Sequence, residues 1–329
     1  MRNWMAFVGL FCLLAMNACT GKRAEVKLQR AEQTLFTSKS REQIQSFLNA
    51  NREFARLYFN TSQFGNDTAL VTALYTRIND PELNVLYRQV QDEFTDMKPL
   101  RNQLSEAFAN IEKEFPTFRA PKIITTVTGF MGPDLVVTDS LVIIGLDYFA
   151  GPKAKYRPPR NEFPEYILRR YQKPYMAPAI VFAISDKYNA TNRADQSLLA
   201  DMVYYGKGYV FTKAMLPEVA DGDSLVIGYT NRQLLDSYAS QGDIWAHFID
   251  NQLLYQTNPA VKQRYINERP FTAEISTQCP GAIGRWLGWR IVGRYHDTNA
   301  SIKIADLMRN DNARNVFAES GYKGQKDEE

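Results

Sequence analysis

The chain has few of the side chains on which metal centres and covalent catalysis depend. Its 329 residues include two histidines, His247 and His296, and three cysteines. A helical zinc site of the HExxH type needs two histidines four residues apart with a glutamate between them. The two histidines here are far apart in sequence, and Ser140 and Ser224 lack the G-x-S-x-G turn of hydrolases. We therefore expect no catalytic residue, no bound metal and no cofactor.

The N-terminal apolar run is too short to be a permanent membrane span. It covers Ala6–Met16, about half of the roughly 20 residues that a spanning helix needs. Arg2 precedes the run, and the small residue Ala18 leads directly to Cys19, as in a bacterial lipoprotein signal. We expect residues 1–18 to be a signal peptide and Cys19 to be the lipidation site, held in membrane lipid by its acyl chains. The alternative is an ordinary secretory signal followed by an incidental cysteine.

The residues around the predicted lipidation site indicate a compartment. Thr20 stands where inner-membrane lipoproteins usually carry aspartate, so we expect a lipoprotein of the outer membrane that faces the periplasm. Cys12 is lost with the signal and Cys19 is acylated, which leaves Cys279 without a disulfide partner in its own chain. An isolated cysteine is most often a small buried apolar residue.

Charge is nearly balanced along the chain. There are 39 lysines and arginines against 36 aspartates and glutamates, a net charge of +3, with no concentrated basic patch. A nucleic-acid-binding surface depends on such a patch, so nucleic acid is excluded as an expected partner. Hydrophobic residues make up 45% of the chain, which is ample for a packed core.

Hydrophobic spacing predicts many helices and one small sheet. Residues 41–114 have a helical pattern, and helices resume after Asn161. Between them, the β-branched segments 122–129 and 135–148 predict a two- or three-strand meander or small sheet, and residues 25–36 contain a further possible strand. The predicted fold class is α+β, predominantly helical with a small β-sheet.

Three predicted helices have recognisable ends or faces. The helix over 195–215 is expected to be capped by Asp195 or Ser197. Another begins with a capping box formed by Thr230 and Gln233. A third, over 281–297, carries Gly284 and Gly288 four residues apart, which indicates close packing against a neighbouring element. The whole chain is expected to divide into a signal peptide (1–18), a lipidated N-terminus and helical segment (19–115), an α+β region (116–322) and a disordered tail (323–329).

Six ordered segments together resemble one known family. They are Lys113–Gly129, Asp139–Gly151, Leu198–Lys207, Ile227–Leu234, Ile244–Tyr255 and Pro280–Tyr295. With the N-terminal lipobox, they are similar to the GldB family of gliding-motility lipoproteins from the Bacteroidetes, over roughly residues 110–325. The resemblance implies a lipoprotein of the cell envelope whose partners are other envelope proteins of the gliding and type IX secretion machinery. It implies no chemical reaction.

The GldB family in turn resembles zinc metallopeptidases that carry HExxH on a helix. The segment of this chain that would correspond, Asp201–Lys207, has neither histidine nor glutamate. The resemblance therefore implies a degenerate form of that fold without its metal. We expect a non-catalytic envelope lipoprotein. The alternatives are a hydrolase, similar to a peptidase, with an unrecognised site, and a lipoprotein that binds a small ligand.

Aromatic residues predict a candidate cleft or partner surface. Tyr204, Tyr205 and Lys207 lie on one helix, and Trp245, His247, Arg285, Trp286 and Trp289 lie on the helices expected to pack against it. In this interpretation the aromatic rings line a groove with Lys207 and Arg285 at its rim. The alternative is a plain core between three helices.

One surface modification is also predicted. Asp67-Thr68-Ala69 matches the short Asp-Ser/Thr-apolar pattern on which this phylum attaches O-linked glycans to periplasmic proteins, and Thr68 lies in a polar segment. A tripeptide of this kind also occurs by chance.

Overall fold

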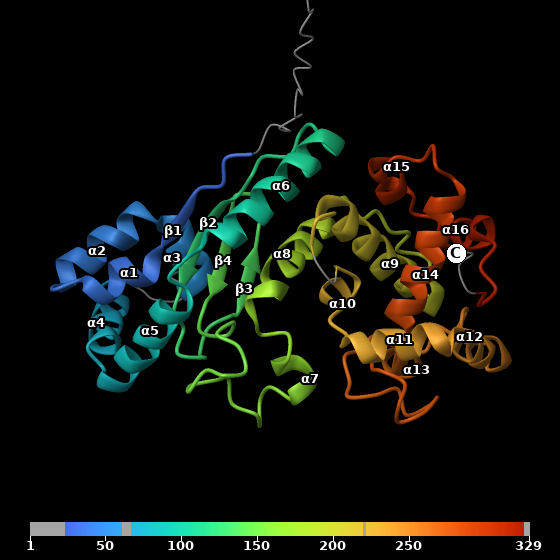
Figure 1. Cartoon of the computed structure of the whole chain (residues 1–329). Coiled ribbons are helices and arrows are strands. Elements are labelled where there is room, and N and C mark those ends of the chain that lie inside the picture. The colour runs from blue at the N-terminus through green and yellow to red at the C-terminus, as the bar shows by residue number, and fades with distance from the viewer. Residues whose placement is uncertain (1–23, 61–66, 220–221, 326–329) are drawn as a thin grey trace, which may run out of the picture.

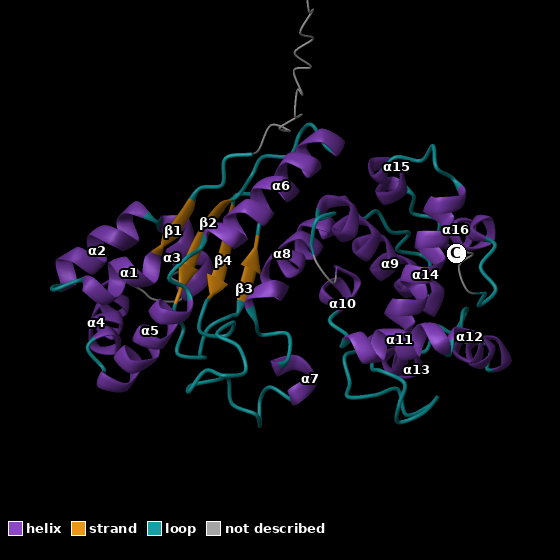
Figure 2. Ribbon diagram, viewed as in Figure 1, coloured by secondary structure: helices purple, strands orange, loops and turns teal. Residues whose placement is uncertain are grey.

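The computed structural model describes residues 24–60, 67–219 and 222–325 (Figure 1). The predicted signal peptide, residues 1–18, and the predicted lipidation site Cys19 lie outside these ranges. Within them, no helix is both long and apolar enough to cross a membrane. The fold is α+β and about 57% helical, with helices grouped around a small sheet (Figure 2), which confirms the predicted fold class.

The sheet has four strands of mixed direction. They are β1 (Leu28–Arg30), β2 (Lys122–Thr126), β3 (Leu135–Val137) and β4 (Leu141–Gly145). Their order is β1-β2-β4-β3, in which β1, β2 and β4 are parallel and β3 pairs antiparallel with β4. The sheet is small, as predicted, but it is not a meander, because β4 returns to pair with β2. The possible strand over residues 25–36 contributes only β1, after which α1 (Ala31–Thr37) begins.

Helices cover both faces of the sheet, because its inner strands are apolar on both sides. Ile123, Val142 and Ile144 belong to the core on one face, and Ile124, Leu141 and Ile143 to the core on the other. The first core includes side chains of α5 (Pro81–Glu93) and α6 (Lys98–Glu114), and the second those of α1, α2 (Arg41–Ala50), α3 (Arg52–Phe59) and α4 (Asp67–Ile78). The first core continues from Val26 to Tyr322 and so joins the sheet to the C-terminal helices.

The C-terminal half is a group of helices beside the sheet (Figure 1). They are α7 (Glu165–Leu168), α8 (Met176–Ser185), α9 (Leu198–Met215), α10 (Gly222–Ile227), α11 (Asn231–Ala239), α12 (Gln241–Asp250), α13 (Pro259–Ile266), α14 (Ile283–Thr298), α15 (Ile304–Arg309) and α16 (Ala313–Ser320). Two 3₁₀ turns, Lys173–Tyr175 and Asp186–Tyr188, flank α8. The sequence did not predict α10 or α13.

Helices α9 and α14 cross at two glycines. A Cβ atom at Gly206 would be 2.3 Å from the carbonyl oxygen of Gly288, so only hydrogen fits on either side of the crossing. Gly284 faces a different element, because a Cβ there would be 3.0 Å from the carbonyl oxygen of Tyr265 at the end of α13. The predicted close packing at Gly284 and Gly288 is confirmed, but with two partners in place of one.

The structure also contains the predicted N-terminal caps of α11 and α9. Thr230 and Gln233 form the predicted capping box of α11. Of the two candidate caps of α9, Ser197 is the one that accepts a hydrogen bond from the helix, from the backbone N–H of Ala200 at 3.2 Å. Asp195 precedes the helix, and its side chain accepts a hydrogen bond from the backbone N–H of Ser197 at 3.0 Å.

The predicted disordered tail, 323–329, is described only to Gln325. Gly324 is buried, and a Cβ there would be 2.5 Å from the Cβ of Trp245. The side chain of Gln241 donates a hydrogen bond to the carbonyl oxygen of Gln325. The prediction is therefore wrong for residues 323–325, which pack against α12 because Tyr322 and Gly324 fit beside the Trp245 ring.

Candidate functional site

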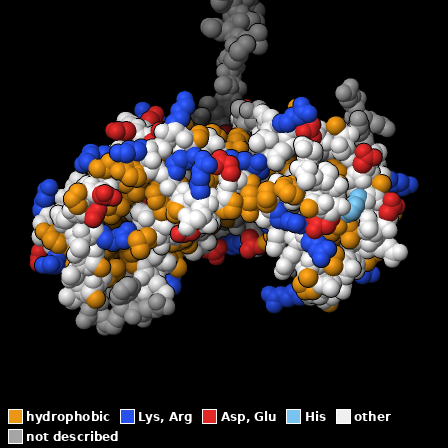
Figure 3. All heavy atoms as spheres, turned by 90° about the horizontal axis from the view of Figure 1, so that it is seen from below, with side chains coloured by type: hydrophobic (Ala, Val, Ile, Leu, Met, Phe, Trp, Pro, Cys, Tyr) orange, Lys and Arg blue, Asp and Glu red, His pale blue; other side chains and the backbone are white. Residues whose placement is uncertain are grey.

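A cavity of about 240 Å³ lies between the sheet edge and the C-terminal helices. Figure 3 views the molecule from the end that carries α7 and α13 and shows it hollowed between two lobes. A second hollow of about 30 Å³ adjoins the first and shares six lining residues with it: Arg170, Tyr209, Ile227, Gly228, Glu268 and Arg285. Arg169, Arg269 and the start of α14 line only the smaller hollow. We call the two hollows together the arginine pocket.

Glu268 lies at the centre of the shared wall. Both of its carboxylate oxygens accept hydrogen bonds from Arg170, one of them at 2.8 Å, in a bidentate ion pair. Arg285 approaches the same carboxylate at 3.4 Å. Burial opposes ionisation of Glu268, but the hydrogen bond and charge of Arg170, with the charges of Arg285 and Arg169, lower its pKa overall. Glu268 is therefore a carboxylate held by arginines.

Arg285 is fixed from three sides. Its Nε donates to the carbonyl oxygen of Ile266 at 2.6 Å, and its guanidinium carbon lies 4.1 Å from the ring centroid of Tyr205. Its side chain is 17% exposed. The expectation that Arg285 lies at the rim of an aromatic groove is wrong. The ring of Tyr205 and the carbonyl of Ile266 replace water around the guanidinium, so the residue lines the pocket wall.

Arg169 supplies a further positive charge. Its Nη1 donates to the side chain of Gln233 at 2.8 Å. Its Nε is buried and has no hydrogen-bond partner among the described residues. Burial and the neighbouring charge of Arg170 lower the pKa of Arg169. The smaller hollow therefore holds more guanidinium groups than the carboxylate of Glu268, the acidic group in its lining, can pair with.

The opposite part of the cavity is largely apolar. It is lined by Leu135 from β3, Phe149, Ile167 from α7, Tyr171, Tyr175, Ala179 and Phe182 from α8, and Leu225 and Val226 from α10. Asp134 is the acidic group there, and it accepts a hydrogen bond from the backbone N–H of Leu135 at 2.9 Å. The cavity thus has one end that suits charge and one that suits apolar groups.

Tyr209 lines both hollows. It is 4% exposed and its ring centroid lies 5.0 Å from that of Phe182 and 5.3 Å from that of Trp289. Burial raises the pKa of Tyr209 to about 12, although Arg285 opposes the shift. The phenol therefore stays protonated at neutral pH and can donate a hydrogen bond.

The N-terminus of α14 points to the smaller hollow. Gly281 and Ala282 line it, and no side chain caps the helix that starts at Ile283. Tyr229 holds this turn, because its hydroxyl donates to the carbonyl oxygen of Gly281 at 2.8 Å. The positive end of a helix of 16 residues adds to the arginine charges.

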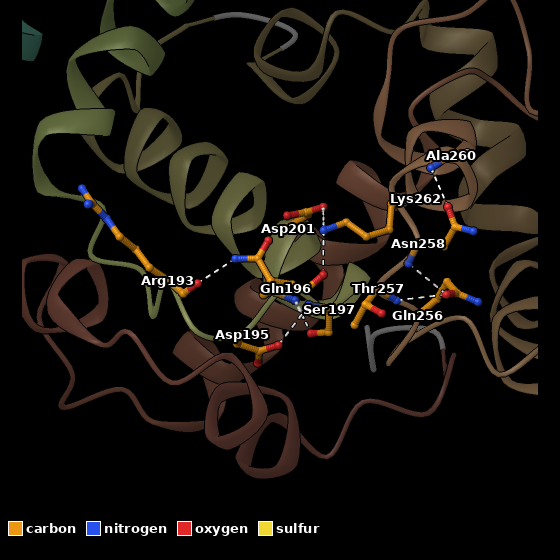
Figure 4. Close-up of polar contacts among 11 residues, drawn as sticks. Arg193, Asp195, Gln196, Ser197, Asp201, Gln256, Thr257, Asn258, Ala260 and Lys262 are labelled. Atoms are coloured by element: carbon orange, nitrogen blue, oxygen red, sulfur yellow. Dashed lines mark hydrogen bonds and ion pairs between the residues drawn. The ribbon is translucent and has the colours of Figure 1, made fainter.

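A polar contact group holds α13 against α9 and so places Glu268, which follows α13 (Figure 4). The ammonium of Lys262 in α13 lies 2.8 Å from the carboxylate of Asp201 in α9 and donates to the carbonyl oxygen of Gln196 at 2.8 Å. Asn258 caps α13 by accepting from the backbone N–H of Ala260 at 3.0 Å.

Lys207 is not at a rim either, which corrects the second half of that prediction. It is 1% exposed, and its ammonium donates to the carbonyl oxygens of Ala190 at 2.7 Å and Asn310 at 2.8 Å. Burial lowers its pKa to about 8, against the opposing charge of Asp311. Lys207 joins the C-terminal end of α15 to α9, because the free carbonyls of a helix end attract a cation.

The remaining aromatic residues predicted as a cleft are dispersed. Tyr204 donates to Asp186. Trp286 is fully buried beside Tyr238, and Trp289 packs on Tyr209. Trp245 packs on Phe317 and Tyr322, and His247 lies 3.0 Å from the Tyr265 hydroxyl. The eight residues therefore do not form one surface; Tyr205, Arg285 and Trp289 are the members next to the arginine pocket.

The structure also bears on the metal site and the glycosylation site considered from the sequence. The described residues contain no group of three or more histidine, cysteine, aspartate or glutamate side chains that could hold a metal ion. In the segment compared with HExxH, Asp201 is ion-paired to Lys262. Thr68 is exposed in the first turn of α4 and so is accessible, but it lies in a helix and not in a polar loop.

The sequence did not predict Arg169, Arg170, Tyr209 or Glu268 as site residues. The pair Arg169-Arg170 follows a short helix, and Glu268 follows a helix that hydrophobic spacing did not identify. A weak local signal is the pair Arg169-Arg170 itself and the arginine next to Pro270, Arg269; no such signal marks Tyr209 or Glu268.

The fold and pocket define an α+β protein with an arginine-lined cavity. The family model for gliding motility protein GldB matches residues 17–324, nearly the whole chain. The chain belongs to the GldB family, which makes it a membrane-anchored lipoprotein of the cell envelope associated with gliding motility. The match extends the resemblance to the N-terminal helices. No curated protein and no solved structure matches the chain.

Proposed function

We propose that this protein is a non-catalytic lipoprotein of the gliding and type IX secretion machinery, anchored in the outer membrane on its periplasmic side through acylated Cys19. It acts by binding other envelope proteins of that machinery. Membership of the GldB family supports the link to gliding. Thr20, in place of aspartate, supports the outer membrane.

One observation carries the non-catalytic part of the proposal. Two groups in the wall shared by the hollows, Glu268 and Tyr209, could move a proton but are poorly suited to do so near neutral pH. Glu268 is held by Arg170 and Arg285 with a lowered pKa, which makes it a weak base. Burial raises the pKa of Tyr209 to about 12, which makes it a weak acid. Such groups bind and orient charge.

The experiment is a dosage series. The chain is expressed from an inducible promoter in a strain of the source bacterium that lacks its own copy, and colony spreading is measured against protein abundance. A stoichiometric component acts one molecule at a time, so spreading should fall in proportion to abundance. A catalyst turns over, so spreading that persists when abundance is reduced to about a tenth of normal contradicts the proposal.

A second measurement controls for indirect effects. The abundance of other envelope proteins that co-purify with the chain is followed at each expression level. Under the proposal, the amount recovered with the chain scales with the chain itself. If spreading is lost while the co-purified amounts stay constant, the chain acts through something other than assembly, and the interaction role is contradicted.

A further inference from the structure

The arginine pocket has the charge and shape of a ligand site, and we propose that it binds a carboxylate attached to a single large apolar group. Two sources share this chemistry: the C-terminal residue of a polypeptide and a free small carboxylic acid. The inference deepens the proposed function, because it takes the pocket to bind and not to react, and it names what is bound.

The charge balance favours an anion. In the smaller hollow, Arg169, Arg170 and Arg285 surround one carboxylate, that of Glu268. Arg269 of the same hollow is paired with Glu274, and Asp134 lines only the larger hollow. A buried charge without a partner is costly, so arginines in excess of carboxylates call for a further anion. The buried Nε of Arg169, which has no partner among the described residues, is a donor available to that anion. The uncapped start of α14 lies in the same wall.

The shape of the smaller hollow favours a carboxylate over a phosphate. Its volume of about 30 Å³ is close to the share of one water molecule in the liquid. A planar carboxylate enters so small a space more readily than a tetrahedral phosphate. Arginine forks also match the two oxygens of a carboxylate, as the bidentate contact between Arg170 and Glu268 already shows in this wall.

The larger hollow sets the size of the attached group. A volume of about 240 Å³ corresponds to about eight water molecules, which is below the range of drug-sized ligand pockets. Leu135, Phe182 and Val226 are among the apolar residues that line it. One branched or aromatic group fits this space, whereas a long acyl chain or several residues would extend outside it.

Arg170 is held in position by the turn opposite. Gly228 has φ +77°, and a Cβ there would be 2.4 Å from the Cδ of Arg170. Glycine at this position therefore allows the arginine stem to cross the turn and reach the shared wall. Gly228 and Arg170 both line the two hollows. The backbone conformation at Gly228 therefore helps to determine where the Arg170 guanidinium lies.

The test uses the mature chain with Cys19→Ser, which leaves every described residue unchanged, and calorimetric titration at low salt. The first probe is N-acetylphenylalanine, which presents a free carboxylate beside one aromatic group. Its amide has the same shape without the charge. We expect the acid to bind at least about tenfold more tightly than the amide, since a charge-assisted hydrogen bond is lost. Equal binding of acid and amide overturns the proposal.

Further probes distinguish the two sources. A tripeptide Ala-Ala-Phe with a blocked N-terminus is compared with 3-phenylpropionate. Tighter binding of the peptide assigns the site to a polypeptide C-terminus, and tighter binding of phenylpropionate assigns it to a free acid; both support the shared chemistry. Inorganic phosphate should not compete, and phosphate that displaces the acid contradicts the carboxylate assignment.

Matched variants locate the binding. Arg169→Gln removes one charge from the pocket. It should weaken binding of the acid by about tenfold and leave binding of the amide unchanged. Arg232→Gln removes the same charge from the exposed face of α11, where the arginine side chain is 85% exposed and pairs with Asp236. It should change neither. Ala179→Leu narrows the apolar end and should weaken both probes, and Ala246→Leu on the exposed face of α12 is its control.

The experiments distinguish a wrong ligand assignment for the arginine pocket from a wrong proposed function. If no carboxylate binds to a folded chain, the ligand assignment is wrong, while proportional loss of spreading in the dosage series would still support a non-catalytic component. If the carboxylate binds but spreading persists at low abundance, the ligand assignment stands and the non-catalytic role fails.

Discussion

Gly288 in α14 lies against Met202 in α9 so closely that a Cβ atom at residue 288 would be 1.9 Å from the Met202 carbonyl oxygen. From the other helix, a Cβ at Gly206 would be 2.3 Å from the Gly288 carbonyl oxygen. The two backbones therefore touch, and no side-chain rotation can make room. This crossing fixes Tyr209 and Arg285, one on each helix, on the wall of the arginine pocket.

The first prediction follows from this crossing. Gly288→Ala should lower the free energy of unfolding by roughly 1–3 kcal/mol or more, the usual cost of overpacking, because the added methyl group meets backbone atoms. Gly293→Ala in the same helix is the matched control. Nothing lies within 4 Å of a Cβ there, so that variant should be neutral or more stable by up to about 1 kcal/mol. Urea unfolding of both measures the difference, and equal stability would refute the close crossing.

The second prediction concerns Lys207. Lys207→Met removes the donor to the carbonyl oxygens of Ala190 and Asn310 and should cost about 2 kcal/mol or more. Lys213→Met is the control on the same helix: its side chain is 57% exposed and pairs with Asp223, so its loss should cost less than about 1 kcal/mol. Thermal or urea unfolding gives both values. A Lys207 variant as stable as the control would contradict the anchoring role.

Lys207 also gives a pH dependence of known sign. The pKa is about 8 in the folded protein and 10.5 ordinarily, so between these values the unfolded chain binds more protons. Stability from this group therefore rises with pH across that window and is flat below about pH 8. The advantage of wild type over Lys207→Met should grow by about 2 kcal/mol between pH 7 and 9.5. A constant or shrinking advantage would show that the folded pKa is not lowered.

The third prediction concerns the thiol of Cys279. The residue is 6% exposed, and burial raises its pKa to about 12, against an opposing hydrogen bond from Thr272. Iodoacetamide at pH 8 should therefore react with native Cys279 at least about a hundredfold more slowly than with the unfolded chain, since the thiolate is the nucleophile. An Ala246→Cys variant supplies an exposed thiol as the positive control. Comparable rates at the two positions would place Cys279 at the surface.

The fourth prediction tests the anchor. Cys19→Ser should release the protein from the membrane pellet and abolish incorporation of labelled palmitate, because several acyl chains on one residue make anchoring effectively permanent. Cys279→Ser controls for loss of a cysteine and should stay in the pellet. Wild-type protein without label, or a Cys19 variant that survives a carbonate wash in the membrane, would exclude lipidation.

Local sequence signals predicted the parts of this fold that depend on neighbouring residues. Thr230 and Gln233 lie three residues apart, and Gly288 lies between the bulky residues Leu287 and Trp289, so each position can be recognised from its neighbours in sequence. Residues 28–30 carry no such signal, because two of the three are polar and the strand exists only by pairing with β2. The strand order of the sheet therefore could not be predicted from the sequence and is known only from the structure.

The candidate site was predicted less well, for a physical reason. Charge suggested that Lys207 and Arg285 would lie at an edge, since burial of a charge is unfavourable without partners. Their partners are backbone carbonyls of Asn310 and Ile266, and such oxygens exist at every position and have no sequence signature. The arginine cluster likewise comes from segments about a hundred residues apart, as the distance from Arg170 to Glu268 in sequence shows.

The first described residue, Ala24, is hydrogen-bonded in both directions to Ser105 of α6. Five peptide units separate it from Cys19, and an extended chain advances at most ~3.6 Å per residue, or about 18 Å in all. A lipid on Cys19 would thus be a short tether that leaves the protein little freedom to turn over on the bilayer. The segment that leads into β1 rises to the upper end of the molecule in Figure 1, opposite α7 and α13, so a lipid on Cys19 would leave the arginine pocket on the side away from the membrane.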